Sequence, residues 1–420
     1  MRITDIDIIP IRPRLAARYA GREVLFGGID RRIIFKIRTD NGLVGYGDHR
    51  LAALNRESVA PLIGRDPFDF INNHLDPGLG GALYDVMGKY LDVPAHKLMG
   101  QKVRDAVSVA AWTSQAAPDQ LATEITRAAN QGYRVFKMHT APFHDVMEQT
   151  RAAARVAPEG FKLHFDFNGN RTLATALPLV KQLEAHPVVG FIEDPFPKSD
   201  RDTWCRLREQ SHIPLIFHVS ASHGNLPELT AGVADIYLLS GVSVGDTLIS
   251  GFACARANVQ VLLQLTGGTL AKALALHMAA VLPTATGHSI HLDDQYEDDI
   301  TRERIDVAAG FSPVPDGPGL GVDVDEDALA RLAARDQEDL SQRRQIGVLQ
   351  LPGGKKLYTS MTPDVSRLTG HEEGMMRGIG LELWTDDDSA EFDRVYEIMQ
   401  TTDAVEVDLP PSKPPAANGD

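Results

Sequence analysis

Residues 133–197 read YRVFKMHTAPFHDVMEQTRAAARVAPEGFKLHFDFNGNRTLATALPLVKQLEAHPVVGFIEDPFP. Three short apolar runs, YRVFKM, FKLHFDF and VVGFIE, are separated here by two amphipathic segments of helical length. Such alternation of strand-length and helix-length segments favours parallel strands that are joined by crossover helices. The stretch therefore predicts two consecutive βα units and the strand that follows them.

The same alternation continues on both sides of this stretch. Strand candidates begin near Val107, Tyr133, Phe161, Val188, Ile213, Asp235, Val259 and Ser289. Helix candidates begin near Pro118, His144, Leu173, Asp200, Leu226, Asp246 and Thr269. This pattern predicts a closed (β/α)7β barrel, whose active site lies at the C-terminal ends of the strands. An open doubly wound sheet is the alternative, but it requires a Gly-rich phosphate loop where the chain reads AAWTS.

Segments outside the barrel predict further parts of an α/β fold. Ile3–Ile11 and Arg32–Arg38 read as strands, and residues 81–100 read as a helix, a turn and a second short helix. We expect an N-terminal α+β capping domain, a TIM-like (β/α)7β barrel and a C-terminal extension. The expected bounds are 1–105 for the capping domain, 106–312 for the barrel, 313–336 for a segment that returns to the cap, and 337–420 for the extension with a disordered Pro-rich tail.

Composition argues against several classes of partner. The 420 residues carry a formal net charge of −15, whereas nucleic acids and anionic membrane surfaces attract clustered Lys and Arg. No apolar run in the sequence approaches the roughly 20 residues that span a bilayer. The N-terminal stretch MRITDIDIIPIRP lacks the apolar core of a signal peptide, and two cysteines provide no disulfide framework. We therefore expect a cytoplasmic protein that acts on a small molecule.

One strand candidate ends in residues that suit acid–base chemistry. Lys137 and His139 share parity along their strand, so their side chains point to the same face. At the catalytic end of a barrel strand they suit an electrostatic stabiliser and a general base. The alternative interpretation is a surface lysine beside an apolar strand.

A pair of carboxylates predicts a metal site. Asp166 and Glu193 lie one βα unit apart, which places them on neighbouring strands at equal depth. Adjacent carboxylates repel each other unless a cation or a proton lies between them, and their oxygens suit Mg²⁺ or Mn²⁺. One further unit leads to Val219, which is no ligand. His218 faces away on a regular strand and becomes the third ligand only if a β-bulge re-aims it.

Polar residues also line one face of the strand that carries Asp166. His164, Asp166 and Asn168 share that face, although a barrel interior is otherwise filled by branched apolar residues. Metal coordination would explain the polar face, because buried polar groups are costly unless they are paired. A hydrogen-bonded turn at residues 168–170 is the alternative explanation.

Several motifs resemble the mandelate racemase/muconate lactonising branch of the enolase superfamily. They are ALYDVMGK at 82–89, VP at 93–94, KLMG at 97–100, TDNGLVGYG at 39–47 and PDGPGLG at 315–321. The resemblance covers about Met1 to Leu332. It implies an α+β cap whose loops close over a (β/α)7β barrel, and removal of a proton α to a carboxylate with Mg²⁺ stabilising the enediolate. It also implies a homo-oligomer.

The resemblance assigns roles to individual residues. Lys137 matches the first lysine of the family's Lys-x-Lys strand, and His139 replaces the second lysine, which is a proton-abstracting base. Asp166 and Glu193 match the first two metal ligands, and Asn168 matches the asparagine that follows the first ligand.

The match fails at other functional positions. The third ligand position is Val219, the aspartate of the family's Asp/His dyad falls near Ser240, and the histidine of that dyad falls at Gln264. Asp293 or Asp294 matches the acidic residue of the last strand. Because one face lacks an evident base, a two-base racemase is disfavoured.

We therefore expect a lyase with a single base, most simply a sugar-acid dehydratase. In this hypothesis His139 takes the α-proton, while Lys137 and a divalent metal (Mg or Mn) stabilise the enediolate. The expected metal ligands are Asp166, Glu193 and His218, and the expected substrate-binding residues are His49, Asn168, His164, Gln264 and Asp293. The substrate is expected to be a small carboxylate or sugar derivative. The alternatives are a metal-independent enzyme that acts on a ketone or lactone, and a non-catalytic homologue of the same fold.

Overall fold

The computed structural model describes most of the chain. The described residues are 1–19, 29, 31–50, 54–141, 144–219, 226–335, 344–351, 353–359, 380–402 and 404–406. The chain forms two compact units, which we call the barrel unit (1–140 and 147–337) and the C-terminal unit (141–146 and 338–420). The predicted disordered tail, from residue 409, lies outside the described residues. In the described part of the chain, no helix is long and apolar enough to cross a membrane.

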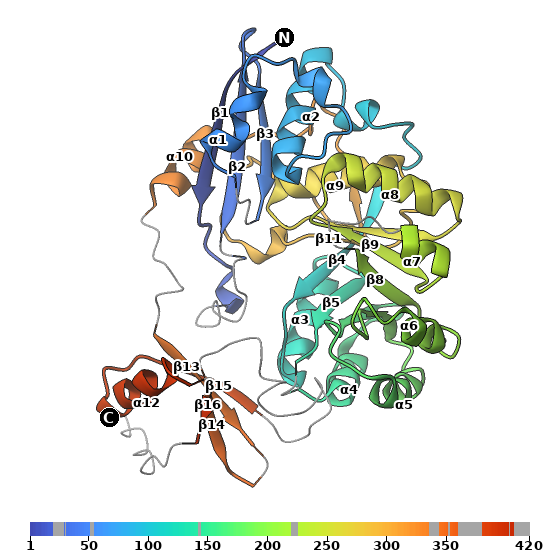
Figure 1. Cartoon of the computed structure of the whole chain (residues 1–420), viewed down its shortest axis with the longest axis vertical. Coiled ribbons are helices and arrows are strands. Elements are labelled where there is room, and N and C mark those ends of the chain that lie inside the picture. Colours follow the sequence, from blue (N-terminus) through green and yellow to red (C-terminus); the bar gives the residue numbers. More distant parts are fainter. Residues whose placement is uncertain are drawn as a thin grey trace. The chain divides into compact units, whose positions relative to one another are not determined.

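The barrel unit begins with a three-stranded antiparallel sheet, in the order β1-β2-β3 (Figure 1). Its strands are β1 (Ile3–Ile11), β2 (Arg32–Thr39) and β3 (Val44–His49). Helix α2 (Pro77–Leu91) packs against β2 and β3 and also against two helices of the barrel. The approach is close at Gly47, where an added Cβ atom would lie 1.8 Å from the carbonyl oxygen of Gly78. Glycine is therefore required at the contact between sheet and helix.

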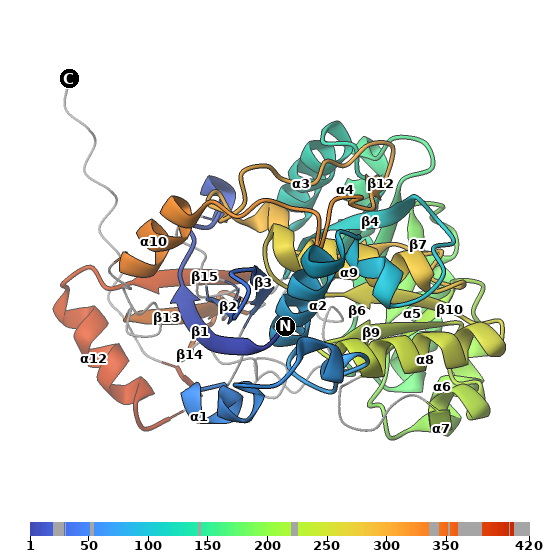
Figure 2. The ribbon, with the colours of Figure 1, turned by 90° about the horizontal axis from the view of Figure 1, so that it is seen from above.

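Short elements complete this cap. They are η1 (Ala17–Tyr19), α1 (Arg56–Val59), η3 (Ala60–Leu62), η4 (Pro67–Phe70) and η5 (Ala95–Leu98). Helix α10 (Glu326–Ala334) returns to the cap from beyond the barrel and packs against β1. The cap sheet, α2 and α10 can be followed in Figure 2.

Eight parallel strands close into the predicted barrel, because β11 pairs with both β10 and β4. The strands are β4 (Ala106–Thr113), β5 (Val135–His139), β6 (Lys162–Asp166), β7 (Val189–Glu193), β8 (Leu215–Val219), β9 (Ile236–Ser240), β10 (Gln260–Gln264) and β11 (Ser289–Ile290). The helices are α3 (Pro118–Asn130), α4 (Val146–Val156), α5 (Leu173–Leu183), α6 (Arg201–Arg208), α7 (Leu226–Ala231), α8 (Val244–Arg256) and α9 (Thr269–Val281). After η6 (Asp293–Gln295), β12 (Phe311–Pro313) pairs antiparallel with β4. The predicted fold class is confirmed.

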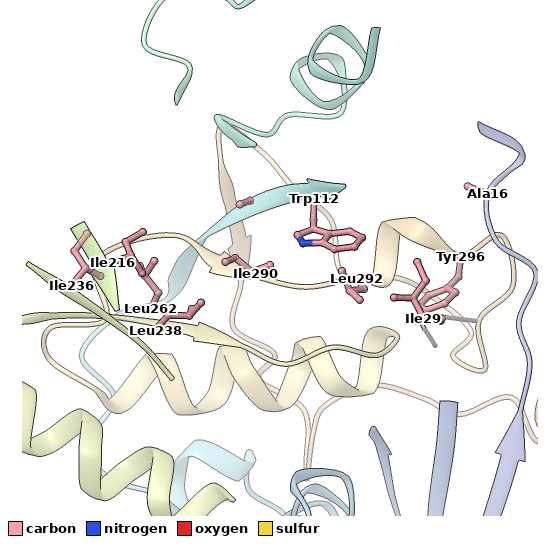
Figure 3. Close-up of a cluster of buried hydrophobic side chains, with 11 residues drawn as sticks. Ala16, Ile29, Trp112, Ile216, Ile236, Leu238, Leu262, Ile290, Leu292 and Tyr296 are labelled. Carbon is pink, nitrogen blue, oxygen red and sulfur yellow. Dashed lines mark hydrogen bonds between the residues drawn. The ribbon is translucent and has the colours of Figure 1, made fainter. Parts of the chain in front are cut away.

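An apolar layer fills part of the barrel interior (Figure 3). Its strand residues alternate along their strands, as the barrel geometry requires. They are Ala110, Trp112, Ile216, Ile236, Leu238, Leu262 and Ile290, and Leu292, Tyr296, Ala16 and Ile29 extend the cluster. Each fully buried isoleucine or leucine side chain of this layer contributes about 1.5–3 kcal/mol to folding. The polar residues that follow on the same inner faces are therefore held by a rigid support.

The C-terminal unit contains a four-stranded antiparallel sheet in the order β15-β13-β14-β16. Its elements are β13 (Gln345–Gln350), β14 (Lys356–Thr359), β15 (Gly380–Thr385), α12 (Ala390–Met399) and β16 (Ala404–Val405). Phe392, Val395 and Met399 of α12 pack against Ile346 and Val348 of the sheet. A separate buried cluster contains Leu349 and Ala141, with Leu351, Leu357 and Leu381 packed against it.

Candidate active site

The inner-facing ends of β5, β6 and β7 meet in register. His139 pairs with Asp166 across β5 and β6, and Asp166 pairs with Glu193 across β6 and β7. The prediction that the two carboxylates lie on neighbouring strands at equal depth is confirmed. Lys137 lies one inner position below His139 on β5, as their shared parity predicted.

The Lys137 ammonium group lies between the two carboxylates. Its Nζ is 2.8 Å from Glu193 Oε2 and 3.1 Å from Asp166 Oδ2, and it donates to Gln264 Oε1 at 3.3 Å. Only 1 % of the Lys137 side chain is exposed. Burial alone would lower the pKa of Lys137, but the charges of Glu193 and Asp166 outweigh burial and raise that pKa. Lys137 is therefore the buried cation that two adjacent carboxylates require.

Glu193 is the most densely bonded acid of the site. It accepts hydrogen bonds from Lys137 at Oε1 (3.0 Å), and His218 Nδ1 lies 3.1 Å from the same oxygen. His164 Nε2 lies 2.7 Å from its other oxygen, Oε2. Burial raises the pKa of Glu193, but Lys137 and the two histidines hold it well below its usual value. Glu193 is therefore ionised at neutral pH.

His218 reaches this site without a bulge. Glu193 pairs with Ile216 rather than with Val219, and β8 continues in regular register along β9. His218 lies two residues beyond Ile216 and therefore faces the interior, as Ile216 does. The expectation that His218 faces away on a regular strand is wrong, because counting residues between strands does not fix their register.

His139 lies at the accessible rim of this cluster. About a third of its side chain (34 %) is exposed, and its Nε2 is 3.4 Å from Asp166 Oδ2. Its ring meets Trp112 edge to face, with 5.6 Å between ring centroids. Burial lowers the pKa of His139, and Asp166 opposes that shift. The net shift is downward, so the imidazole is neutral and can accept a proton near pH 7.

Asp194 is a site residue that the sequence analysis missed. It has a left-handed backbone (φ 42°), and its Oδ1 accepts a hydrogen bond from the His218 N–H at 3.0 Å. Burial and the charges of Glu193 and Asp166 raise the pKa of Asp194 to about 7. The sequence signal was the second acid of the Glu-Asp-Pro run, which lies just beyond the end of β7.

Glu193, Asp194 and His218 form a group that fits a metal ion. One donor atom from each residue lies within 4.8 Å of the others. Two carboxylates with one imidazole suit a divalent cation, and the imidazole favours a transition metal such as Mn²⁺ over Mg²⁺. Asp166 instead contacts Lys137 and His139. Two of the three predicted ligands, Glu193 and His218, belong to this group. The third, Asp166, does not, and its role as a ligand stays a prediction.

The structure places two predicted substrate-binding residues around the cluster. Gln264 accepts the hydrogen bond from Lys137 and pairs with Ser240 at the end of β9. Asn168 follows β6 with a left-handed backbone (φ 52°), and its N–H donates to Asp166 Oδ1 at 2.9 Å. The hydrogen-bonded turn that was the alternative explanation of the polar face is therefore present.

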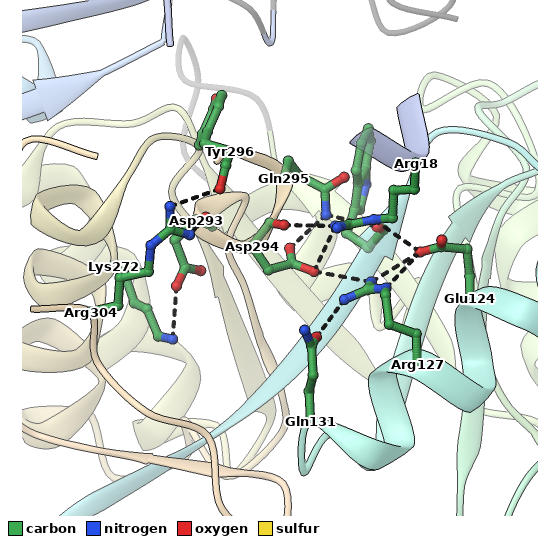
Figure 4. A network of polar contacts seen from close by, with 11 residues as sticks. Arg18, Glu124, Arg127, Gln131, Lys272, Asp293, Asp294, Gln295, Tyr296 and Arg304 are labelled. Carbon is green, nitrogen blue, oxygen red and sulfur yellow. Dashed lines mark hydrogen bonds and ion pairs between the residues drawn. The ribbon is translucent and has the colours of Figure 1, made fainter. Parts of the chain in front are cut away.

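Other predicted residues have partners of their own. His49 Nδ1 lies 2.7 Å from Asp76 Oδ2, at the N-cap of α2. Asp293 accepts a hydrogen bond from Lys272 at 3.0 Å (Figure 4), and only 5 % of the residue is exposed. The neighbouring Asp294 forms ion pairs with Arg18 and Arg127 (3.3 and 3.2 Å), which are visible in the same figure. His164 is fully buried below Glu193.

The protein combines a closed (β/α)7β barrel with an antiparallel cap. A cluster of one lysine and two carboxylates lies at the strand ends, where the active sites of barrel enzymes are found. Residues 120–328 match the family described as Enolase C-terminal domain-like. The barrel belongs to that family, and the resemblance to the mandelate racemase/muconate lactonising branch of the enolase superfamily is confirmed.

Named relatives in this superfamily are enzymes. The D-galactonate dehydratase of Klebsiella pneumoniae (strain 342) is 25 % identical, over 73 % of this chain and 92 % of its own. A mandelate racemase/muconate lactonizing family protein from Azoarcus sp. EbN1 has a TM-score of 0.67 and 22 % identity, covering 80 % of this chain and 98 % of its own. The N-succinyl Arg/Lys racemase of Bacillus cereus ATCC 14579 has a TM-score of 0.68 and 21 % identity, covering 80 % and 99 %.

Proposed function

We propose that this protein is a lyase that abstracts a proton α to a carboxylate, and that it dehydrates a sugar acid. The observation that carries the proposal is the position of His139, a partly exposed imidazole beside a buried ammonium–carboxylate cluster. A neutral imidazole at the rim can accept a proton from a bound substrate, while the buried charges remain fixed. Similarity to a D-galactonate dehydratase supports the reaction class.

The residues divide the reaction between them. His139 takes the α-proton as the C–H bond breaks, and the electron pair moves into an enediolate. The positive charge of Lys137 lies in a water-poor site, where it stabilises the negative charge that develops. His139 then returns the proton to the leaving β-hydroxyl, so that water departs as the C–O bond breaks. The enol that remains tautomerises to a 3-deoxy-2-oxo acid.

A bound divalent cation would supply a Lewis acid to this chemistry. Glu193, Asp194 and His218 would hold it, since their donor atoms converge in the structure. Lys137 would remain in contact with Glu193 and Asp166, where its charge offsets their repulsion. We expect Mn²⁺ or Mg²⁺ to fill this role.

Two further strand ends favour dehydration over racemisation. The inner ends of β9 and β10 carry Ser240 and Gln264, which pair at one level and do not titrate near neutral pH. Racemisation requires an acid or base on each face of the α-carbon. These strand ends supply none, so a one-base reaction in which His139 serves twice is the simpler assignment.

The test is turnover of a sugar-acid library with Mn²⁺ present, with detection of the 2-oxo product. His139→Asn should lower kcat by about 10²–10⁴, the contribution of a positioned general base. The matched control is His212→Asn, because the His212 side chain is 86 % exposed. Exchange of the α-proton in D₂O separates proton abstraction from loss of the hydroxyl. Full turnover by His139→Asn would show that this base assignment is wrong.

A second candidate is a metal-independent reaction on a ketone or lactone. It is favoured by the position of Lys137, whose ammonium already offsets the repulsion between Asp166 and Glu193. In this reading the ammonium alone would stabilise the enolate. Activity that persists after exhaustive chelation would support this candidate, and activity that returns only with added Mn²⁺ or Mg²⁺ would count against it.

A further inference from the structure

Two histidines form a buried pair beneath Glu193. His164 belongs to β6, and His288 directly precedes β11, so the pair joins strands that are distant in the sequence. His164 Nδ1 lies 2.9 Å from His288 Nε2, and both residues are almost completely buried (0 % and 2 % exposed). The ring of Phe191 packs against both imidazoles, with centroid distances of 6.1 and 4.7 Å.

The positions of the protons on the two rings follow from chemistry. Glu193 is ionised and can only accept, so the short contact to its Oε2 requires a proton on His164 Nε2. Two ring nitrogens 2.9 Å apart share a single proton. Burial disfavours a charged ring in either histidine. A neutral His164 with its proton on Nε2 accepts at Nδ1, so His288 Nε2 must donate.

The two oxygens of Glu193 have different environments. Oε2 contacts His164 (2.7 Å) and Lys137 (2.8 Å), both of which are buried donors. Oε1 accepts from Lys137 as well (3.0 Å) and lies 3.1 Å from His218 Nδ1, and His218 is part of the candidate metal group with Asp194. Lys137 contacts both oxygens, so His164 is what distinguishes them, and rotation of the carboxylate would break its contact with Oε2. The histidine pair therefore restrains the oxygen that faces the metal group.

We propose that His288 and His164 form a relay that positions Glu193, with Oε2 held inward and Oε1 presented to His218 and Asp194. The relay consists of the hydrogen bond between the two rings and the 2.7 Å contact from His164 Nε2 to Glu193 Oε2. His164 and His288 are then positioning residues, since neither reaches the rim where substrate would bind. The relay deepens the proposed function. It rests on that function in one respect, the binding of a divalent cation by Glu193, Asp194 and His218. Outer-shell partners of a ligating residue typically change metal affinity by 10- to 100-fold when they are removed.

The first measurement is calorimetric titration of Mn²⁺ into the chelator-stripped full chain. His164→Phe and His288→Phe should each bind Mn²⁺ at least tenfold more weakly than wild type, and His164→Gln, which keeps a donor, should recover part of the loss. The matched control is His277→Phe, because His277 forms another buried histidine pair with His96 (Nδ1 to Nδ1, 3.3 Å). Wild-type Mn²⁺ affinity in a folded His164→Phe variant would overturn the proposal.

The second measurement does not depend on a metal. Selective ¹⁵N-histidine labelling reports which ring nitrogen carries the proton, and signals missing from the His164→Phe and His288→Phe variants identify the two residues. We expect both rings to be neutral with the proton on Nε2. A His164 ring that is cationic, or that carries its only proton on Nδ1, would overturn the relay. If the wild-type protein binds no Mn²⁺, the metal assignment of the proposed function fails. The relay is then tested only by the protonation of the two histidine rings.

Discussion

Replacing Lys137 by methionine tests the charge balance on which the site depends. Methionine keeps most of the length and apolar surface of the stem but removes the ammonium group. The side chains of Lys137, Asp166 and Glu193 are 1 %, 5 % and 0 % exposed, so water does not replace the lost partner. Removing one partner of a buried ion pair costs about 3–5 kcal/mol. We expect Lys137→Met to lose about that much free energy of unfolding.

The assay is urea denaturation of the barrel at pH 7, with Lys198→Met as the control. Lys198 also pairs with an acid of the site, Asp194 at 3.3 Å, but its side chain is 38 % exposed. An ion pair in that setting contributes at most about 1 kcal/mol. If Lys137→Met lost no more stability than Lys198→Met, the reasoning would be refuted.

The pH dependence of the same variant gives a second check. In wild type the depressed pKa of Glu193 contributes stability above its unfolded pKa, and this contribution is lost as the pH falls. In Lys137→Met the facing carboxylates repel each other at neutral pH, and protonation of one of them relieves that repulsion. The difference in free energy of unfolding between wild type and Lys137→Met should therefore become smaller at acid pH.

Three further predictions concern other parts of the barrel unit. Burial lowers the pKa of His277 to about 4, so the folded protein keeps this ring neutral while the unfolded chain protonates it below the unfolded pKa. The free energy of unfolding should therefore fall by about 2 kcal/mol between pH 7 and pH 5 through this residue. In His277→Asn the urea midpoint should depend less steeply on pH. Gly47→Ala should destabilise the protein by about 3 kcal/mol in thermal unfolding, because the carbonyl of Gly78 cannot move away, and wild-type stability would contradict this. Asp194→Ala should abolish calorimetric Mn²⁺ binding, whereas Asp166→Ala should weaken it less; the reverse order would restore the ligand set expected from the sequence.

The sequence predicted those features that depend on local pattern. The described barrel strands and helices begin within two residues of their predicted starts, since periodicity and turn residues are local signals. The parity of Lys137 and His139, and the equal depth of Asp166 and Glu193, follow from the same patterns. Helix α12 was not predicted, although Phe392, Val395 and Met399 follow helical spacing.

Features that depend on register and on distant strands could not be predicted. The inward direction of His218 results from the pairing of Glu193 with Ile216, and the length of a βα unit does not determine that pairing. Asp194 lies beyond the end of its strand and has a left-handed backbone. The alternation of side chains along a strand therefore does not predict where it points. His164 and His288 meet only because the barrel closes, which brings residues of β6 close to the start of β11.

The membership of residues 141–146 in the C-terminal unit has a consequence for the order of folding. Ala141 and Leu349 share a buried cluster, although the stretch 147–337 lies between them in the chain. Synthesis runs from the N-terminus, so all eight barrel strands, the last of which ends at Ile290, are made before Leu349. Contacts at such sequence separation carry a large loop-closure cost and form late. Ala141, two residues after His139, therefore reaches its final packing only after Leu349 has been made.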